Sequence, residues 1–155
     1  YDSLQQIITK RAKLRAMHLL SDMGRTESQL RTKLKQGGYT EDAVEAAIRY
    51  VKSFGYINDV EYARSFIDSR KERKSKKELY AALVQEGVSS EIVEQVFEEA
   101  DYGEEDSRQA IEALMRKRNY NPETADAKEK QKMMGYLMRK GFSYQDVRNV
   151  LQVCE

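Results

Sequence analysis

The sequence predicts an all-α fold made of three tandem three-helix repeats. Strand signals are weak, because β-branched residues never form an alternating run, and the only proline is Pro122. One phrase occurs three times, as GGYTEDAV at 37–44, EGVSSEIV at 86–93 and KGFSYQDV at 140–147. Around each copy apolar residues recur four positions apart, which places them on one helical face. We expect the repeats to stack into an elongated, curved rod of right or left hand.

The repeated phrase describes the end of one helix, a turn and the start of the next. Its glycines, Gly38, Gly87 and Gly141, follow the last core leucine by four residues and suit the left-handed conformation that closes a helix. A hydroxyl residue comes two positions later and offers an N-cap for the following helix. These capping residues are Thr40, Ser89 and Ser143.

The remaining helices of each repeat are predicted from apolar spacing and capping pairs. The first helices are expected over about 4–22, 60–72 and 104–118. Each second helix should begin at a capping box, with an acceptor at the N-cap and Glu or Gln three residues later. The pairs are Thr26 with Gln29, Ser75 with Glu78, and Asp126 with Glu129. We therefore divide the chain into repeats at 1–54, 55–102 and 103–155.

Composition narrows the class of protein. Apolar residues make up 40% of the chain, and no apolar run approaches the roughly 18 residues of a membrane span. The single cysteine, Cys154, cannot form an internal disulfide, which is typical of a reducing compartment. We expect a monomeric cytoplasmic protein.

Charge is segregated along the chain, although the net charge is only +1. Residues 1–77 contain 17 basic and 10 acidic side chains, residues 78–106 contain 10 acidic and no basic ones, and residues 107–155 contain 10 basic and 6 acidic ones. A molecule of this kind can present a cationic surface to an anionic partner.

Residues for catalysis are scarce. The chain has one histidine, His18, one cysteine, no glycine-rich phosphate loop and no metal-ligand spacing. The acidic pair Glu98 and Glu99 fits a solvated helix end better than a cation site. We expect a protein that is not an enzyme and binds no cofactor.

The strongest charge feature is the basic run RKERKSKK at 70–77. Its first part suits a helix C-terminus, where the dipole favours cations, but its last two lysines fall in the first turn of the next helix, where the dipole disfavours them. That cost favours a contact with an anionic partner over a merely solvated face. The candidate residues are Arg70, Lys71, Arg73, Lys74, Lys76 and Lys77.

Two further basic groups and a tyrosine extend the predicted binding surface. One group lies in the first helix and the other at the end of the seventh, and Tyr56 supplies an amphipathic ring suited to an interface. The additional residues are Lys10, Arg11, Lys13, Arg15, Arg116, Lys117, Arg118 and Tyr56.

Several motifs resemble the RecX family of bacterial recombination regulators. They are RTESQL at 25–30, GYINDVEYA at 55–63 and LVQEGVSSEIV at 83–93, with RKGF at 139–142 as a thinner match. In this pattern Gly55 ends a helix, Ile57 packs between repeats, and Asp59 caps the helix that follows. The sequence departs from the family at Ser75, near which glycine is frequent.

The resemblance implies a function as well as a fold. RecX-like proteins bind the RecA filament on DNA and suppress its ATP hydrolysis, strand exchange and co-protease activity, so the implied partner is RecA, with weak or indirect contact to single- or double-stranded DNA. Two alternatives remain open. Residues 30–48 also read as a helix-turn-helix for duplex DNA, although Glu41, Asp42 and Glu45 oppose phosphates there. A generic helical adaptor would bind through the acidic segment 78–106.

Overall fold

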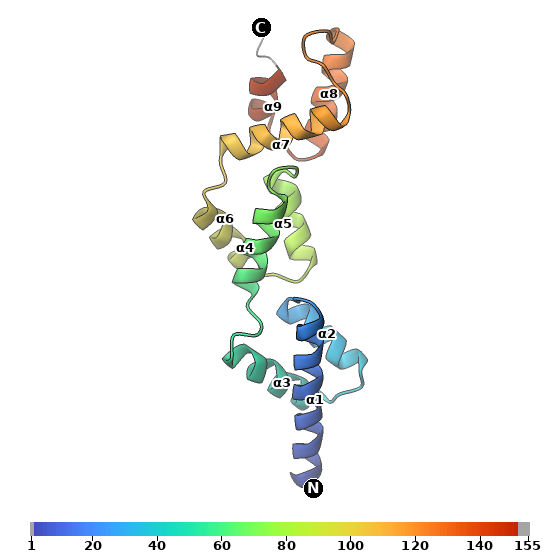
Figure 1. Cartoon of the computed structure of the whole chain (residues 1–155), viewed down its shortest axis with the longest axis vertical. Helices are drawn as coiled ribbons and strands as arrows, with labels where there is room; N and C mark the ends of the chain where they lie inside the picture. Colours follow the sequence, from blue (N-terminus) through green and yellow to red (C-terminus); the bar gives the residue numbers. More distant parts are fainter. Residues whose placement is uncertain (1, 152–155) are drawn as a thin grey trace. The chain divides into compact units, whose positions relative to one another are not determined.

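The computed structural model describes residues 2–151, so Cys154 lies outside the described residues. Over this range the chain forms nine helices and no strand, which confirms the all-α prediction (Figure 1). The helices are α1 (Asp2–Asp22), α2 (Glu27–Gln36), α3 (Glu41–Ser53), α4 (Asp59–Arg70), α5 (Lys76–Gln85), α6 (Ser90–Ala100), α7 (Glu104–Lys117), α8 (Ala127–Arg139) and α9 (Tyr144–Leu151).

The turn of the repeated phrase has the predicted conformation in all three copies. Gly38, Gly87 and Gly141 have φ angles of 87°, 99° and 105°, in the left-handed region that glycine reaches without a Cβ clash. The hydroxyl two residues later then accepts a hydrogen bond from the amide three residues beyond it. The three distances are 3.3 Å at Thr40, 3.3 Å at Ser89 and 3.1 Å at Ser143.

The second helices also begin where the capping pairs predicted. Both reciprocal bonds are present at Thr26 with Gln29 and at Ser75 with Glu78. At Asp126 the carboxylate accepts from the backbone N–H three residues on, at 2.8 Å. These bonds satisfy amides that have no partner within their own helix.

The described chain divides into two compact units. Unit 1 contains residues up to 63 together with 84–93, and unit 2 contains 64–83 together with 94 onward. In unit 1, α1 packs along α3, and the core includes the fully buried Leu30, Leu34 and Val44. In unit 2, α9 packs on both α7 and α8 around Ile111 and Leu137. Removing one such leucine side chain costs about 2–5 kcal/mol, so these cores hold their helices in place.

Two N-cap hydroxyls also join consecutive repeats. In unit 1, Thr26 Oγ1 donates to the carbonyl of Glu86 at 2.8 Å, and in unit 2, Ser75 Oγ donates to the carbonyl of Lys140 at 2.7 Å. Each acceptor directly precedes a turn glycine. Because Thr26 and Ser75 are 0% and 1% exposed, each hydroxyl uses its donor and its acceptor inside the protein. We call these two contacts the repeat joints.

The turn glycines at the repeat joints are also sites of close approach. A Cβ added to Gly87 would lie 2.4 Å from Ser28 Cβ, and one added to Gly141 would lie 2.7 Å from Ser75 Oγ. At Gly38, which has the same conformation but belongs to no repeat joint, a Cβ would meet nothing within 4 Å. Gly87 and Gly141 are therefore restricted to glycine for two reasons: the backbone is in the left-handed region, and a Cβ would clash with a neighbouring side chain.

The prediction for Asp59 was wrong. The side chain of Asn58 caps α4, accepting from the amides of Val60 and Glu61 at 3.0 and 3.2 Å. Asp59 instead accepts from the Glu27 amide at 2.9 Å, so it serves the start of α2. Burial raises the pKa of Asp59. Asn58 lies one residue before α4 and therefore has the N-cap position, whereas Asp59 is the first residue of that helix.

None of the helices within residues 2–151 is both long and apolar enough to cross a membrane.

Candidate functional site

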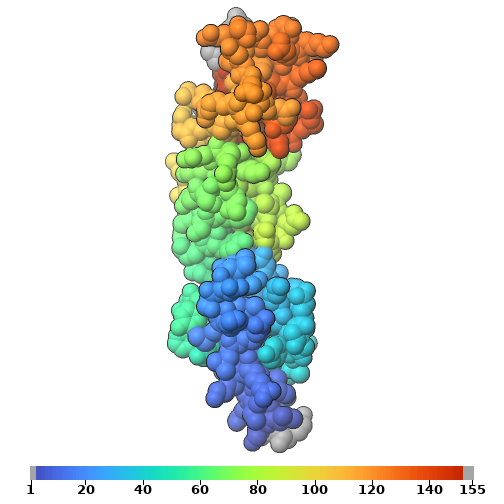
Figure 2. Space-filling model, turned by 45° about the vertical axis from the view of Figure 1, so that its right-hand side comes forward, coloured from blue at the N-terminus to red at the C-terminus, as the bar shows by residue number. Residues whose placement is uncertain are grey.

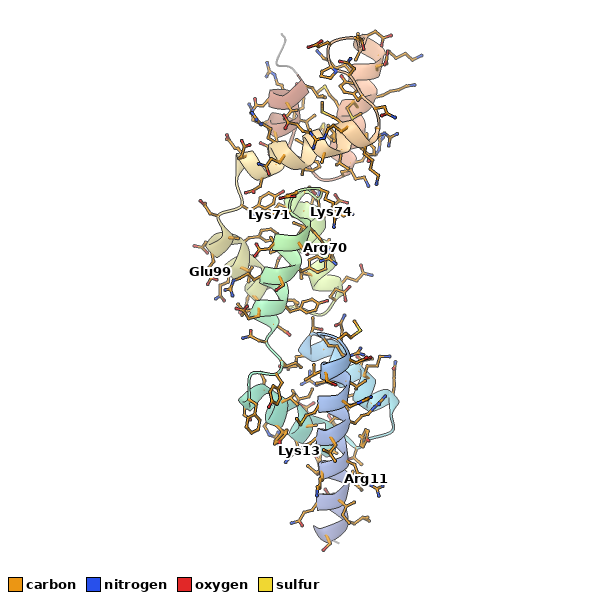
Figure 3. The ribbon with its side chains drawn as sticks, in the orientation of Figure 1. Arg11, Lys13, Arg70, Lys71, Lys74 and Glu99 are labelled. Carbon is orange, nitrogen blue, oxygen red and sulfur yellow. The ribbon has the colours of Figure 1, made fainter. Side chains whose placement is uncertain are left out.

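The basic run 70–77 connects the end of α4 to the start of α5. The amides of Arg73 and Lys74 both donate to the Arg70 carbonyl, at 3.1 Å, so the chain winds one more turn beyond α4. Tyr102 then fixes this turn, because its hydroxyl donates to the Lys74 carbonyl at 3.1 Å. Burial raises the pKa of Tyr102 to about 12, which keeps the hydroxyl protonated as a donor. Figure 3 shows Arg70, Lys71 and Lys74 at this end of α4.

Unit 2 brings this turn to one side of a hollow of about 800 Å³, which we call the basic groove. Cations reach it from the turn after α4, from the last turn of α7 and from the residue that follows α8. The cations are Arg73, Lys74, Arg116, Lys117 and Lys140. Two of the predicted basic groups, distant in sequence, therefore face the same groove.

The positive charge of the basic groove is not cancelled by ion pairs. Within residues 2–151, none of its five cations forms a salt bridge. Three carboxylates also line the groove, but two are engaged elsewhere. Glu78 accepts from the Ser75 amide at 3.5 Å, and Glu112 lies 3.8 Å from Arg108. The groove therefore presents five cations against three carboxylates, of which Glu72 is the third. An anionic partner is favoured there.

Other predicted residues from the basic run have partners within unit 2. The Arg70 guanidinium lies 3.9 Å from the centre of the Phe66 ring. Lys71 Nζ lies 4.0 Å from Asp106 Oδ1. Arg70 and Lys71 are thus held by contacts within the protein, whereas Arg73 and Lys74 line the basic groove.

The two lysines at the start of α5 line a second hollow, of about 460 Å³, on whose walls Tyr80 and Tyr102 also lie. Lys76 Nζ is 5.4 Å from the centre of the Phe97 ring. Both Lys76 and Lys77 occupy the first turn, as predicted, where the helix dipole disfavours a cation.

The basic residues of α1 and Tyr56 belong to unit 1 and are not among the residues that line the basic groove of unit 2. Lys10, Arg11 and Arg15 are exposed, and Lys13 Nζ lies 4.9 Å from the Tyr50 ring centre. Arg11 and Lys13 project from α1 in Figure 3. Tyr56 is 52% exposed and stacks on Phe54, with ring centres 5.6 Å apart.

Sequence reasoning missed Lys140, the fifth cation of the groove. In the repeat alignment Lys140 directly precedes Gly141 just as Glu86 precedes Gly87, but this position alone does not give the contact with Ser75. The hydrogen bond from Ser75 Oγ to the Lys140 carbonyl holds Lys140 next to the start of α5. Its Nζ lies 5.6 Å from the Tyr136 ring centre, and that ring also lines the groove.

Both alternative interfaces contain carboxylates that are already engaged in ion pairs. On α3, Glu41 and Asp42 occupy the first turn, and Glu45 pairs with Arg31 at 2.8 Å, which lowers the pKa of Glu45. That helix would present carboxylates to phosphates. In the acidic segment, Glu99 pairs with Arg64 at 3.0 Å.

Chemistry at a metal centre has no support in the described part of the chain. No group of three or more His, Cys, Asp or Glu side chains there is arranged to hold a metal ion. His18 is exposed on α1.

Comparison with known proteins identifies the family. The patterns of the first, second and third three-helix domains of RecX match residues 12–50, 58–96 and 104–151. Regulatory protein RecX of Caldanaerobacter subterraneus subsp. tengcongensis is 32% identical, over 95% of this chain and 72% of that protein. Regulatory protein RecX of Clostridium acetobutylicum is 26% identical, over 97% and 74%.

Solved structures agree on the fold. The crystal structure of RecX from Lactobacillus salivarius superposes with a TM-score of 0.79 at 22% identity, over 96% of this chain and 97% of that one. With three domain patterns in tandem, a relative above 30% identity and the same fold, the chain belongs to the RecX family of regulatory proteins.

Proposed function

We propose that this protein is a non-enzymatic, cytoplasmic regulator that binds the RecA filament on DNA and inhibits its ATPase, strand-exchange and co-protease activities. Family membership supports the target. The basic groove is the observation that carries the proposal, because five cations without ion pairs form a surface suited to the acidic side chains of a partner.

The composition of the groove favours a protein over bare phosphates as its occupant. Carboxylates stand among its cations, and the partly exposed Ala113 and Tyr136 contribute apolar surface. Carboxylates repel a phosphate backbone, whereas a protein segment can pair with both signs of charge and cover the apolar part. The groove is therefore the proposed recombinase contact, with DNA contacted weakly or indirectly.

The test is the rate of single-stranded-DNA-dependent ATP hydrolysis by RecA, measured while this protein is added at substoichiometric amounts. Wild-type protein should inhibit. The double variants Arg73→Glu with Lys74→Glu, and Arg116→Glu with Lys117→Glu, should each lose most of that inhibition, because each reverses two of the five cations that line the groove.

A matched control reverses two exposed lysines of α2, Lys33 and Lys35, which lie outside the groove. This variant should inhibit like the wild type. Equal loss in the control and the groove variants would contradict a specific surface, and no inhibition by the wild-type protein would contradict the RecA target.

A further inference from the structure

One face of α8 carries a stripe of cations that the basic groove does not include. Lys128, Lys132 and Arg139 lie four and seven residues apart, with Gly135 between the last two, so all four share one helical face. Together with Arg118, at the end of α7, they line a hollow of about 650 Å³. We call this surface the α8 stripe. It lies in the third repeat, drawn in orange and red in Figure 2.

The charge of the α8 stripe is less mixed than that of the basic groove. Four cations line the hollow with a single carboxylate, Glu129. Within residues 2–151 none of the four cations forms a salt bridge, whereas Arg31 and Arg64 each have a carboxylate partner. An uncompensated positive surface of this kind attracts polyanions and is strengthened by low salt.

Gly135 is an unusual residue for the interior of a helix. Glycine costs about 1 kcal/mol relative to alanine at such a position. Here the backbone lies against the Arg139 side chain, because a Cβ at Gly135 would be 3.3 Å from Arg139 Nη1. The absent side chain leaves room beside the backbone for the Arg139 guanidinium, which is exposed and lines the hollow.

Arg118, which lines the same hollow, contacts an aromatic ring. Its guanidinium lies 4.1 Å from the centre of the Tyr136 ring, and this contact restricts the motion of the side chain. Tyr120 lies on the same wall. All four cations of the α8 stripe are exposed, and Arg118 also contacts the Tyr136 ring.

We propose that the α8 stripe binds the phosphate backbone of a nucleic acid strand, as a site separate from the basic groove. From Lys128 to Arg139 the helix rises about 16 Å, at about 1.5 Å per residue. At the duplex value of about 3.4 Å of axis per nucleotide of one strand, this length spans roughly four or five phosphates. The contacts are to charge rather than to bases, so binding is independent of sequence.

The stripe suits phosphates better than an acidic protein. Carboxylates repel a phosphate backbone. The basic groove has three carboxylates beside its five cations, whereas the α8 stripe has one carboxylate beside four cations. A line of cations with few carboxylates instead matches a line of phosphates.

The experiment measures binding of the full chain to a short fluorescent single-stranded oligodeoxynucleotide by anisotropy, without recombinase, over a range of salt concentrations. Four phosphate contacts predict a slope of log K against log salt of about −3, at about −0.7 for each contact. A triple variant, Lys128→Gln, Lys132→Gln and Arg139→Gln, should lower affinity at least about tenfold and reduce the slope by about two. Circular dichroism verifies its fold.

The matched control removes three exposed cations elsewhere, Lys33→Gln, Lys35→Gln and Arg49→Gln. It should retain most of the affinity. Equal loss in the control, or an unchanged affinity and slope in the triple variant, would overturn the site. So would tight binding of polyglutamate in place of the oligonucleotide, because that would assign the stripe to an acidic protein.

Discussion

Replacing Gly87 by alanine tests the first repeat joint, and Gly38→Ala is its matched control. Both glycines have left-handed backbone angles, so alanine at either position is strained by about 1–2 kcal/mol. Only at Gly87 does the new methyl group also meet a neighbour, because its Cβ would lie 2.4 Å from Ser28 Cβ. Overpacking of this kind costs typically about 1–3 kcal/mol. Gly38→Ala should therefore lose about 1–2 kcal/mol, and Gly87→Ala about 2–5 kcal/mol.

The assay is urea unfolding followed by circular dichroism, with the free energy of unfolding compared between variants. A third variant, Ser28→Gly combined with Gly87→Ala, isolates the contact because it removes both Ser28 atoms that the methyl group would meet. It should recover most of the difference in the free energy of unfolding between Gly38→Ala and Gly87→Ala. Equal losses for Gly38→Ala and Gly87→Ala, or no recovery in the double variant, would refute the close contact at the repeat joint.

Three further predictions concern single groups. Ser75→Ala removes both the helix cap and the hydrogen bond to the Lys140 carbonyl, so it should lower the free energy of unfolding in urea by about 2–3 kcal/mol. Ser75→Thr keeps the hydroxyl and should lower it by less than about 1 kcal/mol. Tyr120→Phe should stabilise by about 1 kcal/mol in the same assay, because the buried Tyr120 hydroxyl has no hydrogen-bond partner within residues 2–151, and a loss of stability would contradict this. The hydrogen bond from Lys52 lowers the pKa of Glu27 below its ordinary 4.5, so its contribution to stability is present above pH 4.5 and is lost as the pH falls through the lower folded value. Glu27→Gln should flatten the fall of thermal stability in that acidic range, and an unchanged pH profile would contradict the prediction.

Local signals in the sequence predicted the helices well because their causes are local. Gly38 and Thr40 act on residues within one turn of themselves, so their types and spacing were sufficient. The same reasoning misassigned Asp59 by a single position, since Asn58 next to it is an equally good N-cap.

What the sequence could not reveal depends on residues far apart in the chain. Thr26 and Ser75 were recognised as caps, but their second bonds reach carbonyls 60 and 65 residues away. Lys140 was missed for the same reason, because its place in the basic groove follows from the second repeat joint. The α1 cations were grouped with the basic run on charge alone, although they belong to the other compact unit.

Asp126 holds the position in the third repeat that Thr26 and Ser75 hold in the first two, and its side chain is exposed. A hydroxyl has a proton to give as well as lone pairs, whereas an ionised carboxylate only accepts. Asp126 can therefore start its own helix but would repel the carbonyl of an incoming repeat. Asp126→Thr would therefore give the third repeat the hydroxyl donor that Thr26 and Ser75 give the first two.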